Sequence, residues 1–505
     1  MPLLSWFNRD ADLTRAAQTP YRLLEPVPEL SYGDADSPNM LIEGDNLDAL
    51  KSLLPYYAGQ VKCIFIDPPY NTRSAFEHYD DNLEHSQWLS MMYPRLELLR
   101  ELLSEDGSLW VTLDDNEAHY FRVIADEVFS RKNFLANVVW QSKDTPGNNA
   151  TGIAQTHNHV FVYRKSTAFA PQLLERDEKQ RGYYSNPDND PRGDWLAAPL
   201  TRAEHRDRDY YELTNLAGRK VLPPKGSSWR RPPGKLKELM ADNRIWWGKE
   251  GSAEFPSEKK FLSEAKDGVV NKTWWPYDFA GSTRQASAEL KALFDGRKAF
   301  DTPKPERLIY RALQISTGEG DLVLDSFLGS GTTAAVAHKM RRRWIGIEAG
   351  DHARTLCKPR LEKVVDGDQG GISETAGWKN GGGFRFFRLG HSVFDEGGHV
   401  REGVSFSHLA AHIWHAETGV ARSGGAGEQA FLGEHAGIGY YLLFGGIPET
   451  TVGPGKGLLT RRLLRSLPKF NGPKVIYSEA CTLSAEQLRE ADITFRQIPY
   501  EIRAR

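Results

Sequence analysis

Hydrophobic and polar residues follow one another regularly along the first 165 residues, and the pattern predicts strands and helices in alternation. Val61–Ile66 is an apolar run, which is typical of a strand buried on both faces. Asn46–Leu54 carries leucines at helical spacing, and Gln87–Leu103 is a longer amphipathic segment. The other predicted elements of this part are strands at Met40–Glu43, Leu109–Leu113, Asn137–Trp140 and Val160–Tyr163 and a helix at Glu117–Val128. Such alternation predicts an α/β fold with helices on both faces of a sheet.

The pattern changes between Ser166 and Thr302, where apolar periodicity fades and Pro, Gly, Arg and Trp become frequent. Aromatic side chains interleaved with basic ones suit stacking on bases and neutralising phosphates. We therefore interpret 166–302 as a target-recognition insertion that binds DNA. The alternative is a small irregular domain with the tryptophans in its core. The basic candidates, which have Asp and Glu interleaved with them, are Arg202, Arg206, Arg208, Arg219, Lys220, Arg230 and Arg231.

Strand–helix alternation resumes after Thr302. The predicted elements are helices at Glu306–Ser316 and Gly331–Lys339 and strands at Leu322–Leu324 and Trp344–Ile347. Glycine-rich stretches at Asp366–Gly371 and Gly381–Gly383 predict a linker, and a small α/β module follows. Its predicted elements are strands at Tyr440–Phe444 and Val475–Tyr477 and a basic helix at Leu458–Leu467. The expected parts are thus 1–165 and 303–366 as two halves of one domain, the insertion 166–302, and 367–505 as linker and C-terminal module of unknown role.

Composition narrows the class of protein. The 505 residues carry a net charge of −3. Any binding to DNA therefore requires a local basic face, because the net charge of the chain is not positive. No apolar run reaches the roughly 18 residues that a membrane span needs. Cys63, Cys357 and Cys481 form no CxxC pair, which argues against a disulfide framework or a zinc ribbon. With no secretory signature at the N-terminus, we expect a cytoplasmic protein without a metal.

The first motif that carries chemistry is Asp67-Pro68-Pro69-Tyr70, directly after the predicted buried strand. Residues just beyond the carboxyl end of a strand face the ligand crevice of an open α/β sheet. The carboxylate of Asp67 and the carbonyl of Pro68 can accept hydrogen bonds from the two hydrogens of a base amino group. That arrangement frees the nitrogen lone pair for attack on a methyl donor by positioning and electrostatics alone. Tyr70 offers a flat face on which a flipped base can stack.

The second motif runs from Leu324 to Thr333 (LDSFLGSGTT) and predicts a strand, a glycine turn and a helix. Glycines let the backbone approach a ligand closely. Glu348 ends the next predicted strand, where an acidic residue can hold two ribose hydroxyls. Ala334 stands where a dinucleotide fingerprint has its third glycine, which suits S-adenosylmethionine because that cofactor has no pyrophosphate.

Together the two motifs resemble the amino-methyltransferases of DNA, in which DPPY is catalytic and FxGxG binds S-adenosylmethionine. Because DPPY comes first, the chain looks like the β-class permutation. It is most similar to the Mod subunits of type III restriction-modification systems and their solitary relatives, through DPPYNT, FLGSGTT and GGFRFFRL at Gly382–Leu389. The resemblance implies a doubly wound, Rossmann-like methyltransferase sheet. It implies catalytic roles for Asp67, Pro68, Pro69 and Tyr70 and cofactor contacts for Asp45, Asn46, Lys304, Asp325, Phe327, Gly329, Gly331, Thr332 and Glu348.

The resemblance also implies the substrate and partners. DPPY favours adenine N6 of double-stranded DNA over cytosine N4, with the base flipped out of the duplex. A homodimer and a restriction or translocation subunit are the expected partners, in restriction-modification or phage defence near a bacterial or archaeal nucleoid. Two residues depart from the family pattern. Arg73 replaces a common glycine after DPPYNT, and Leu328 replaces a common alanine.

Other interpretations stay open. The chain can be a methyltransferase of RNA or of a protein amide, or a DNA-reading specificity subunit of a larger defence complex. His408, His412 and His415 have helical spacing but no second ligand pair, so structural roles are expected. The segment His157-Asn158-His159 precedes a predicted strand and either faces the target pocket or serves the structure. The glycines at 453–457 do not form a P-loop, so no ATPase motor is predicted in this chain.

Overall fold

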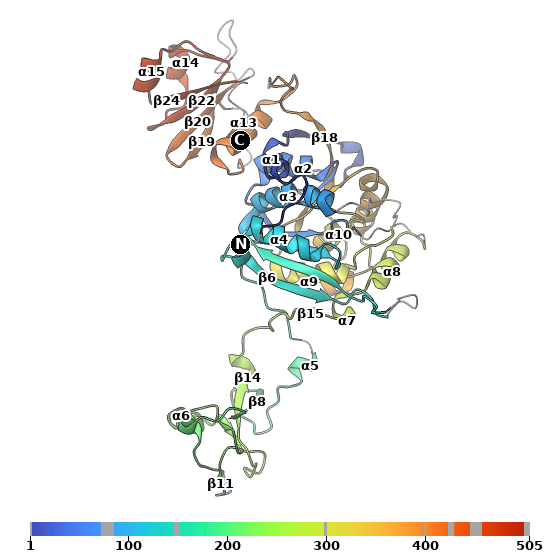
Figure 1. Ribbon diagram of the computed structural model, residues 1–505, viewed down its shortest axis with the longest axis vertical. Coiled ribbons are helices and arrows are strands. Elements are labelled where there is room, and N and C mark those ends of the chain that lie inside the picture. Colours follow the sequence, from blue (N-terminus) through green and yellow to red (C-terminus); the bar gives the residue numbers. More distant parts are fainter. Residues whose placement is uncertain are drawn as a thin grey trace. The chain divides into compact units, whose positions relative to one another are not determined.

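A computed structural model describes residues 3–71, 85–145, 152–176, 178–296, 300–397, 399–422, 429–444 and 457–498 (Figure 1). The chain divides into two compact units. The main unit contains Met1–Gln172 and Lys272–Arg505, and the inserted unit is Leu173–Asn271. Within the described residues, no helix is both long and apolar enough to cross a bilayer.

The main unit is built on one 11-stranded sheet, with strand order β1-β18-β3-β17-β16-β4-β5-β7-β6-β15, and β2 beside β18. Its six central strands, β18 to β5, run parallel to one another, whereas β7 is antiparallel to both of its neighbours. The bounds are β1 Arg22–Pro26, β2 Tyr32–Gly33, β3 Met40–Glu43, β4 Val61–Ile66, β5 Leu103–Leu113, β6 Phe134–Trp140, β7 Asn158–Arg164, β15 Trp274–Trp275, β16 Leu322–Asp325, β17 Arg343–Glu348 and β18 Gly383–Ser392. The predicted doubly wound α/β sheet is confirmed.

The helices of the main unit form two packed groups, one from each half of the sequence. In the first group α2 contacts α3, and α3 contacts α1 and α4; in the second, α10 contacts α9 and α11. The bounds are α1 Arg9–Gln18, α2 Asn46–Tyr57, α3 His85–Leu102, α4 Ala118–Phe129, α7 Tyr277–Ala280, α8 Thr283–Leu293, α9 Glu306–Ser316, α10 Thr332–Lys339, α11 Lys358–Val365 and α12 Ser373–Ala376. The leucines that predicted α2 are buried, and Asp45 caps the helix by accepting from the N–H groups of Leu47 and Asp48.

One prediction about the chain after 366 is wrong. The glycine-rich stretch at Gly381–Gly383 was expected to be part of a linker, but Gly383 begins β18, which pairs in parallel with β3 and antiparallel with β1. The burial of Phe384 and Phe386 in this strand explains the difference. A glycine is needed at position 383 because its backbone lies close to Tyr32 and Asp34. A Cβ at Gly383 would lie 2.3 Å from the backbone nitrogen of Asp34.

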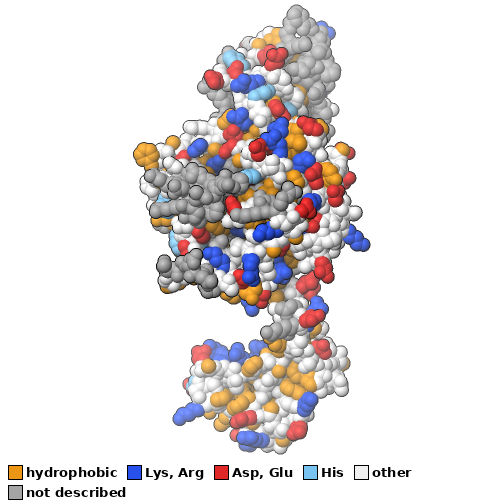
Figure 2. All heavy atoms as spheres, turned by 90° about the vertical axis from the view of Figure 1, so that its right-hand side faces the viewer, with side chains coloured by type: hydrophobic (Ala, Val, Ile, Leu, Met, Phe, Trp, Pro, Cys, Tyr) orange, Lys and Arg blue, Asp and Glu red, His pale blue; other side chains and the backbone are white. Residues whose placement is uncertain are grey.

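The inserted unit has small sheets, β8-β14-β13, β9-β12 and β10-β11, and one helix of nine residues. Trp195, Trp229 and Trp247 are buried in it, so these tryptophans build its core, as the alternative interpretation expected. Figure 2 shows Lys and Arg interspersed with Asp and Glu over its visible face. The bounds are α5 Glu178–Arg181, β8 Trp195–Pro199, β9 Thr201–Arg202, β10 Leu213–Thr214, β11 Lys220–Val221, β12 Ser228–Trp229, α6 Pro233–Ala241, β13 Ile245–Trp246 and β14 Ser257–Phe261.

The C-terminal part of the main unit carries a four-stranded sheet with strand order β19-β20-β22-β24. The basic helix predicted at Leu458–Leu467 is shorter in the structure, because Leu458–Leu459 forms strand β21 and Thr460 caps the helix that follows. The bounds are α13 Phe406–Thr418, β19 Phe431–His435, β20 Ile438–Leu443, β21 Leu458–Leu459, α14 Arg461–Ser466, β22 Lys474–Ser478, β23 Ala480–Cys481, α15 Ala485–Glu490 and β24 Ile493–Gln497.

Candidate functional site

The two sequence motifs meet at the carboxyl edge of the sheet. Strands β4 and β16 are neighbours, with Ile64 opposite Leu324. Asp67 follows β4, and Asp325 is the last residue of β16, so both carboxylates lie at the same edge. They line one cavity of about 240 Å³. Its lining includes Asp67, Pro68, Pro69 and Tyr70 from the first motif and Asp325, Phe327, Leu328, Gly329, Ser330, Thr332 and Thr333 from the second.

Asp67 is held by two side chains from distant parts of the sequence. The hydroxyl of Thr112, near the end of β5, donates to Oδ1 at 2.5 Å. The ammonium of Lys304 forms an ion pair with Oδ2. Lys304 is itself buried and also lies 4.9 Å from the centre of the Tyr70 ring. The carboxylate therefore has a fixed orientation and a neighbouring positive charge.

The rest of the first motif is fixed through the backbone and one asparagine. The indole of Trp88 donates to the carbonyl of Pro69 at 2.7 Å. No donor among the described residues bonds the carbonyl of Pro68, which leaves it able to accept from a ligand. Asn158, the first residue of β7, donates to the Tyr70 hydroxyl at 3.4 Å. Burial, followed by the charge of Asp67, raises the pKa of Tyr70 well above its usual value, so its hydroxyl keeps its proton.

The second motif forms a tight loop between β16 and α10. Glu348, at the end of β17, accepts from the backbone N–H of Gly329 at 2.6 Å. Asp325 accepts from the backbone N–H of Phe327 at 2.9 Å. Gly331 has a φ of 78°, in the left-handed region that favours glycine, and α10 begins at the next residue. These bonds shape the loop so that Phe327 and Gly329 face the cavity.

The carboxyl of Asp325 has a raised pKa. It is buried, and this burial raises the pKa of its carboxyl to about 7, with smaller contributions from the charges of Asp67 and Glu348. Hydrogen bonds from Thr333 and from the backbone of Phe327 lower the pKa of this carboxyl. A cationic ligand in the cavity would favour the ionised carboxylate.

The structure places some candidate residues around the cavity rather than in it. Asp45 caps α2 and pairs with Arg95 at 3.1 Å. Asn46 donates to the carbonyl of Ser326 at 2.7 Å and accepts from Arg95 at 2.5 Å. They brace the loop after β16 from behind. Lys304, expected to contact the cofactor, does line the cavity and pairs there with Asp67.

Sequence reasoning did not find Thr112. It is a buried polar residue in the otherwise apolar stretch Leu109–Leu113, and such a residue is a usable signal because buried hydroxyls need a partner. Asn158 belongs to the segment that was expected either to face the target pocket or to serve the structure, and it lines the cavity. Asn71, which follows Tyr70, and His85, the first residue of α3, both bond the buried carboxylate of Glu117, at 2.6 and 2.7 Å.

The two departures from the family pattern have different outcomes. Leu328 is buried at the cavity, and a Cβ at Gly346 would lie 2.6 Å from its side chain, so the glycine makes room for it. Thr72 and Arg73 lie outside the described residues.

Comparison with known proteins agrees with this geometry. Residues 61–358 match the family described as DNA methylase, which includes N6 and N4 methyltransferases. The StyLTI Mod subunit of Salmonella typhimurium is 31% identical over 369 residues, covering 66% of this chain and 54% of that protein. The HindVI Mod subunit of Haemophilus influenzae, a probable type III restriction-modification enzyme by its description, is 31% identical over 409 residues, covering 70% and 54%.

This chain thus spans about half the length of the curated relatives it matches. Among solved structures, the PvuII DNA methyltransferase, described as cytosine-N4-specific, aligns with 14% identity and a TM-score of 0.37 over 69% of this chain and 98% of that one. The family match covers more than half of the sequence and includes both motifs of the cavity. The chain belongs to the N6/N4 DNA methylase family.

Proposed function

We propose that this protein transfers a methyl group from S-adenosylmethionine to the exocyclic amino nitrogen of a DNA base, and that the base is adenine. The observation that carries the proposal is the single cavity lined by both Asp67 and the loop after β16. A methyl acceptor held by Asp67 and a methyl donor held by the loop would meet within it.

The residues of the loop suit this cofactor. S-adenosylmethionine supplies an electrophilic methyl group on a positively charged sulfur. Asp325 places a carboxylate against that positive charge, and Phe327 offers an apolar surface. Glu348 lies directly behind Gly329, at the position where an acidic side chain can hold ribose hydroxyls.

The base side of the cavity determines the chemistry. Asp67 and the Pro68 carbonyl would accept hydrogen bonds from the amino group of the flipped base, and Tyr70 would stack on its ring. The bound cofactor would supply the methyl carbon, and Asp67 and Pro68 would leave the nitrogen lone pair free to attack it. A C–N bond would form as the C–S bond breaks, and the proton released by the nitrogen would pass to solvent. Lys304 holds Asp67 in a fixed orientation through their ion pair before the base binds.

The inserted unit is proposed to read the target sequence, since its exposed arginines suit phosphate contacts. The proposal includes pairing with a restriction subunit, because two relatives are named Mod subunits of type III enzymes. Adenine is preferred because the DPPY motif resembles that of adenine-N6 enzymes, and cytosine N4 is the alternative that the family name keeps open.

The test is methylation of duplex DNA by the purified protein with tritiated cofactor, followed by mass spectrometry of the nucleosides. We expect N6-methyladenine, and we expect Asp67→Ala to lower its rate by about 10²- to 10³-fold while cofactor binding stays the same. Asp106→Ala, at an aspartate with 52% side-chain exposure, is the matched control. Detection of N4-methylcytosine would show that the target base is cytosine instead of adenine. Methylation that is unaffected by Asp67→Ala would overturn the assigned mechanism.

A further inference from the structure

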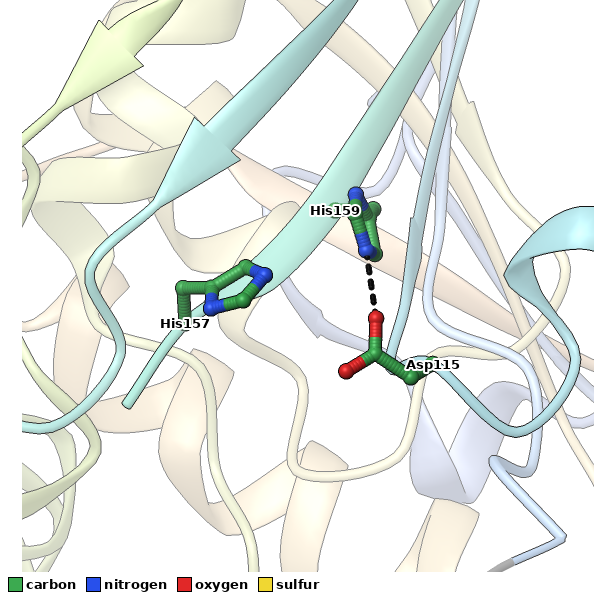
Figure 3. Close-up of side chains that lie close together, drawn as sticks. All are labelled: Asp115, His157 and His159. Carbon is green, nitrogen blue, oxygen red and sulfur yellow. Dashed lines mark hydrogen bonds and ion pairs between the residues drawn. The ribbon is translucent and has the colours of Figure 1, made fainter. Parts of the chain in front are cut away.

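Three potential metal ligands lie together beside the candidate site, and we call Asp115, His157 and His159 the His–Asp cluster. One ligand atom from each residue lies within 4.8 Å of the others. Nε2 of His159 is 2.8 Å from Oδ1 of Asp115, and the two imidazole centres are 5.2 Å apart. Figure 3 shows both rings and the carboxylate gathered around one region.

The strand pattern explains why these side chains meet. His159 is the second residue of β7, and His157 directly precedes the strand, two residues before His159. Residues two apart in extended backbone point to the same side, and both rings lie near Asp115 (Figure 3). Leu113 at the end of β5 pairs with His159 in antiparallel register. Continuing that register by two residues brings Asp115 opposite His157. Asn158 points to the other face, where it contacts Tyr70.

Neighbouring amides orient two members of the cluster. Asn137 on β6 presents both its amide nitrogen, at 3.0 Å, and its oxygen, at 3.3 Å, to Nδ1 of His159. Either tautomer of His159 therefore has a partner, including the one with a proton on Nδ1 and a free lone pair on Nε2. Gln155 donates to Oδ2 of Asp115 at 2.9 Å. Such outer partners are typical of imidazole and carboxylate ligands in metal sites.

We propose that the His–Asp cluster binds one divalent transition-metal ion, with zinc as the ion that its ligand set suits. Two imidazoles and one carboxylate are an established ligand set for zinc, with one coordination position left to water. Zinc places its ligand atoms about 2.0–2.2 Å from the ion, so neighbouring ligand atoms are roughly 3.3 Å apart. Small side-chain rotations bring the cluster to that spacing, and the bond from His159 to Asp115 gives way to two bonds to the metal.

Metal binding would fix the start of β7 to the end of β5. Because His159 is buried and Asp115 is 53% exposed in its side chain, the ion would be reached from the Asp115 side. Asn158 lies between the two histidine ligands, so the same ion would hold the asparagine that contacts Tyr70. The site is separate from the methyl-transfer chemistry and does not depend on the proposed function.

The experiment measures zinc binding directly. The full chain is stripped with a chelator and titrated with Zn²⁺ by calorimetry, without DNA or cofactor, and Co²⁺ serves as a visible-absorption probe of coordination. We expect one equivalent per chain with imidazole–carboxylate coordination. His157→Ala and Asp115→Asn should each lower the affinity at least about tenfold. Zinc should raise the melting temperature of the wild type and of neither variant.

His391→Ala is the matched control, because it removes an exposed histidine that only contacts the adjacent Ser392 carbonyl. It should bind zinc as the wild type does. Equal zinc affinity in the wild type and His157→Ala, or no saturable binding to the wild type, would overturn the proposal. Asp115→Asn preserves side-chain size, so the test stands even if His157→Ala does not fold.

Discussion

At the scale of single residues, the candidate site depends on how one carboxylate is held. Asp67 has Thr112 on one oxygen and Lys304 on the other, and these contacts come from two segments distant in sequence. If positioning supplies most of the rate enhancement, Asp67 must already be oriented when the base binds. The partners of Asp67 are therefore expected to affect turnover although only Asp67 is proposed to touch the base amino group.

Thr112→Val tests this orientation. The substitution removes a hydrogen bond to a charged group, worth about 1.5 kcal/mol, so we expect kcat for methylation to fall about tenfold. The KM for the cofactor should stay the same, because Thr112 contacts Asp67, which is proposed to hold the base. Thr112→Ser keeps the hydroxyl and should restore the rate. A fall in kcat that Thr112→Ser shares fully would indicate a packing role instead.

Asp325 predicts a pH dependence of cofactor binding. Its carboxyl has a pKa of about 7 because of burial, and a cationic cofactor binds better to the ionised form. As the pH falls below 7, binding must first remove a proton, so affinity should weaken by up to about tenfold per pH unit. Above 7 this dependence should vanish. Calorimetry of S-adenosylmethionine binding between pH 5.5 and 8 measures it.

Asp325→Asn is the control for that profile. The amide cannot titrate, so its affinity should be lower but nearly independent of pH over the same range. A wild-type slope that persists in Asp325→Asn would assign the titration to another group.

At the scale of elements, helices α9, α10 and α11 are joined by a buried charge network. Glu306, the first residue of α9, accepts from Lys339 at 3.0 Å and from Arg360 at 3.0 Å. Lys339 also pairs with Asp368 at 2.9 Å. All three side chains of the central group are at most 4% exposed. The network ties together α9, which begins two residues after Lys304, and α10, which follows the loop after β16.

Glu306→Ala should destabilise the protein strongly. Removing Glu306 leaves the buried Arg360 without its carboxylate partner and Lys339 with Asp368 alone, and breaking a buried ion pair in this way costs about 3–5 kcal/mol. The lower stability would appear in thermal unfolding of the main unit as a markedly lower melting temperature. Glu374→Ala, at an exposed glutamate on α12, should leave the melting temperature unchanged. Similar melting temperatures for the two variants would show that the network contributes little.

At the scale of the whole molecule, α13 connects the C-terminal sheet to the N-terminal elements through histidines. The ring of His412 packs edge-on against Tyr21 at 4.2 Å, and His415 bonds the Tyr21 hydroxyl at 3.2 Å. Neither ring nitrogen of His412 has a partner among the described residues. The ionisable side chains that line the two cavities beside His412 are Tyr21, Arg22, Lys51, Tyr56, Tyr57, Glu97, Glu101, Arg385, His408 and His415. Burial lowers the pKa of His412 to about 3 and that of His415 to about 4.

This contact predicts a difference in acid stability between the wild type and His412→Phe. A histidine kept neutral by the fold opposes folding below its ordinary pKa of 6.5, because the unfolded chain takes up a proton that the folded chain excludes. The wild type should therefore lose stability relative to His412→Phe by about 1.4 kcal/mol per pH unit below 6.5. Above that pH the two proteins should show the same dependence.

Denaturant unfolding at pH 7.5 and pH 5.0 measures the difference. Burial also raises the pKa of Glu97 to about 7. Folding is therefore accompanied by uptake of a proton at Glu97 in part of the same pH range. The comparison with His412→Phe removes this contribution because both proteins contain Glu97. Parallel loss of stability in the two proteins would show that His412 is protonated in the folded state.

The sequence by itself determined the local elements and the order of the motifs. Strands β3 and β4 and helix α9 were predicted with the bounds that the structure shows, because apolar runs and helical spacing are local patterns. The placement of Asp67 and Asp325 at strand ends also follows from those runs. The same reasoning failed at Gly383–Ser392, where glycines indicated a linker but the tertiary structure needed them beside Tyr32.

Only the tertiary structure decided which residues meet. Lys304 and Thr112 reach Asp67 because β4 lies between β16 and β5, and strand order is not encoded by any local pattern. Asp115 meets His157 and His159 through the antiparallel register of β5 and β7. The periodicity of apolar residues indicates only which side of a segment is buried. These contacts depend instead on which segments pair and in what register.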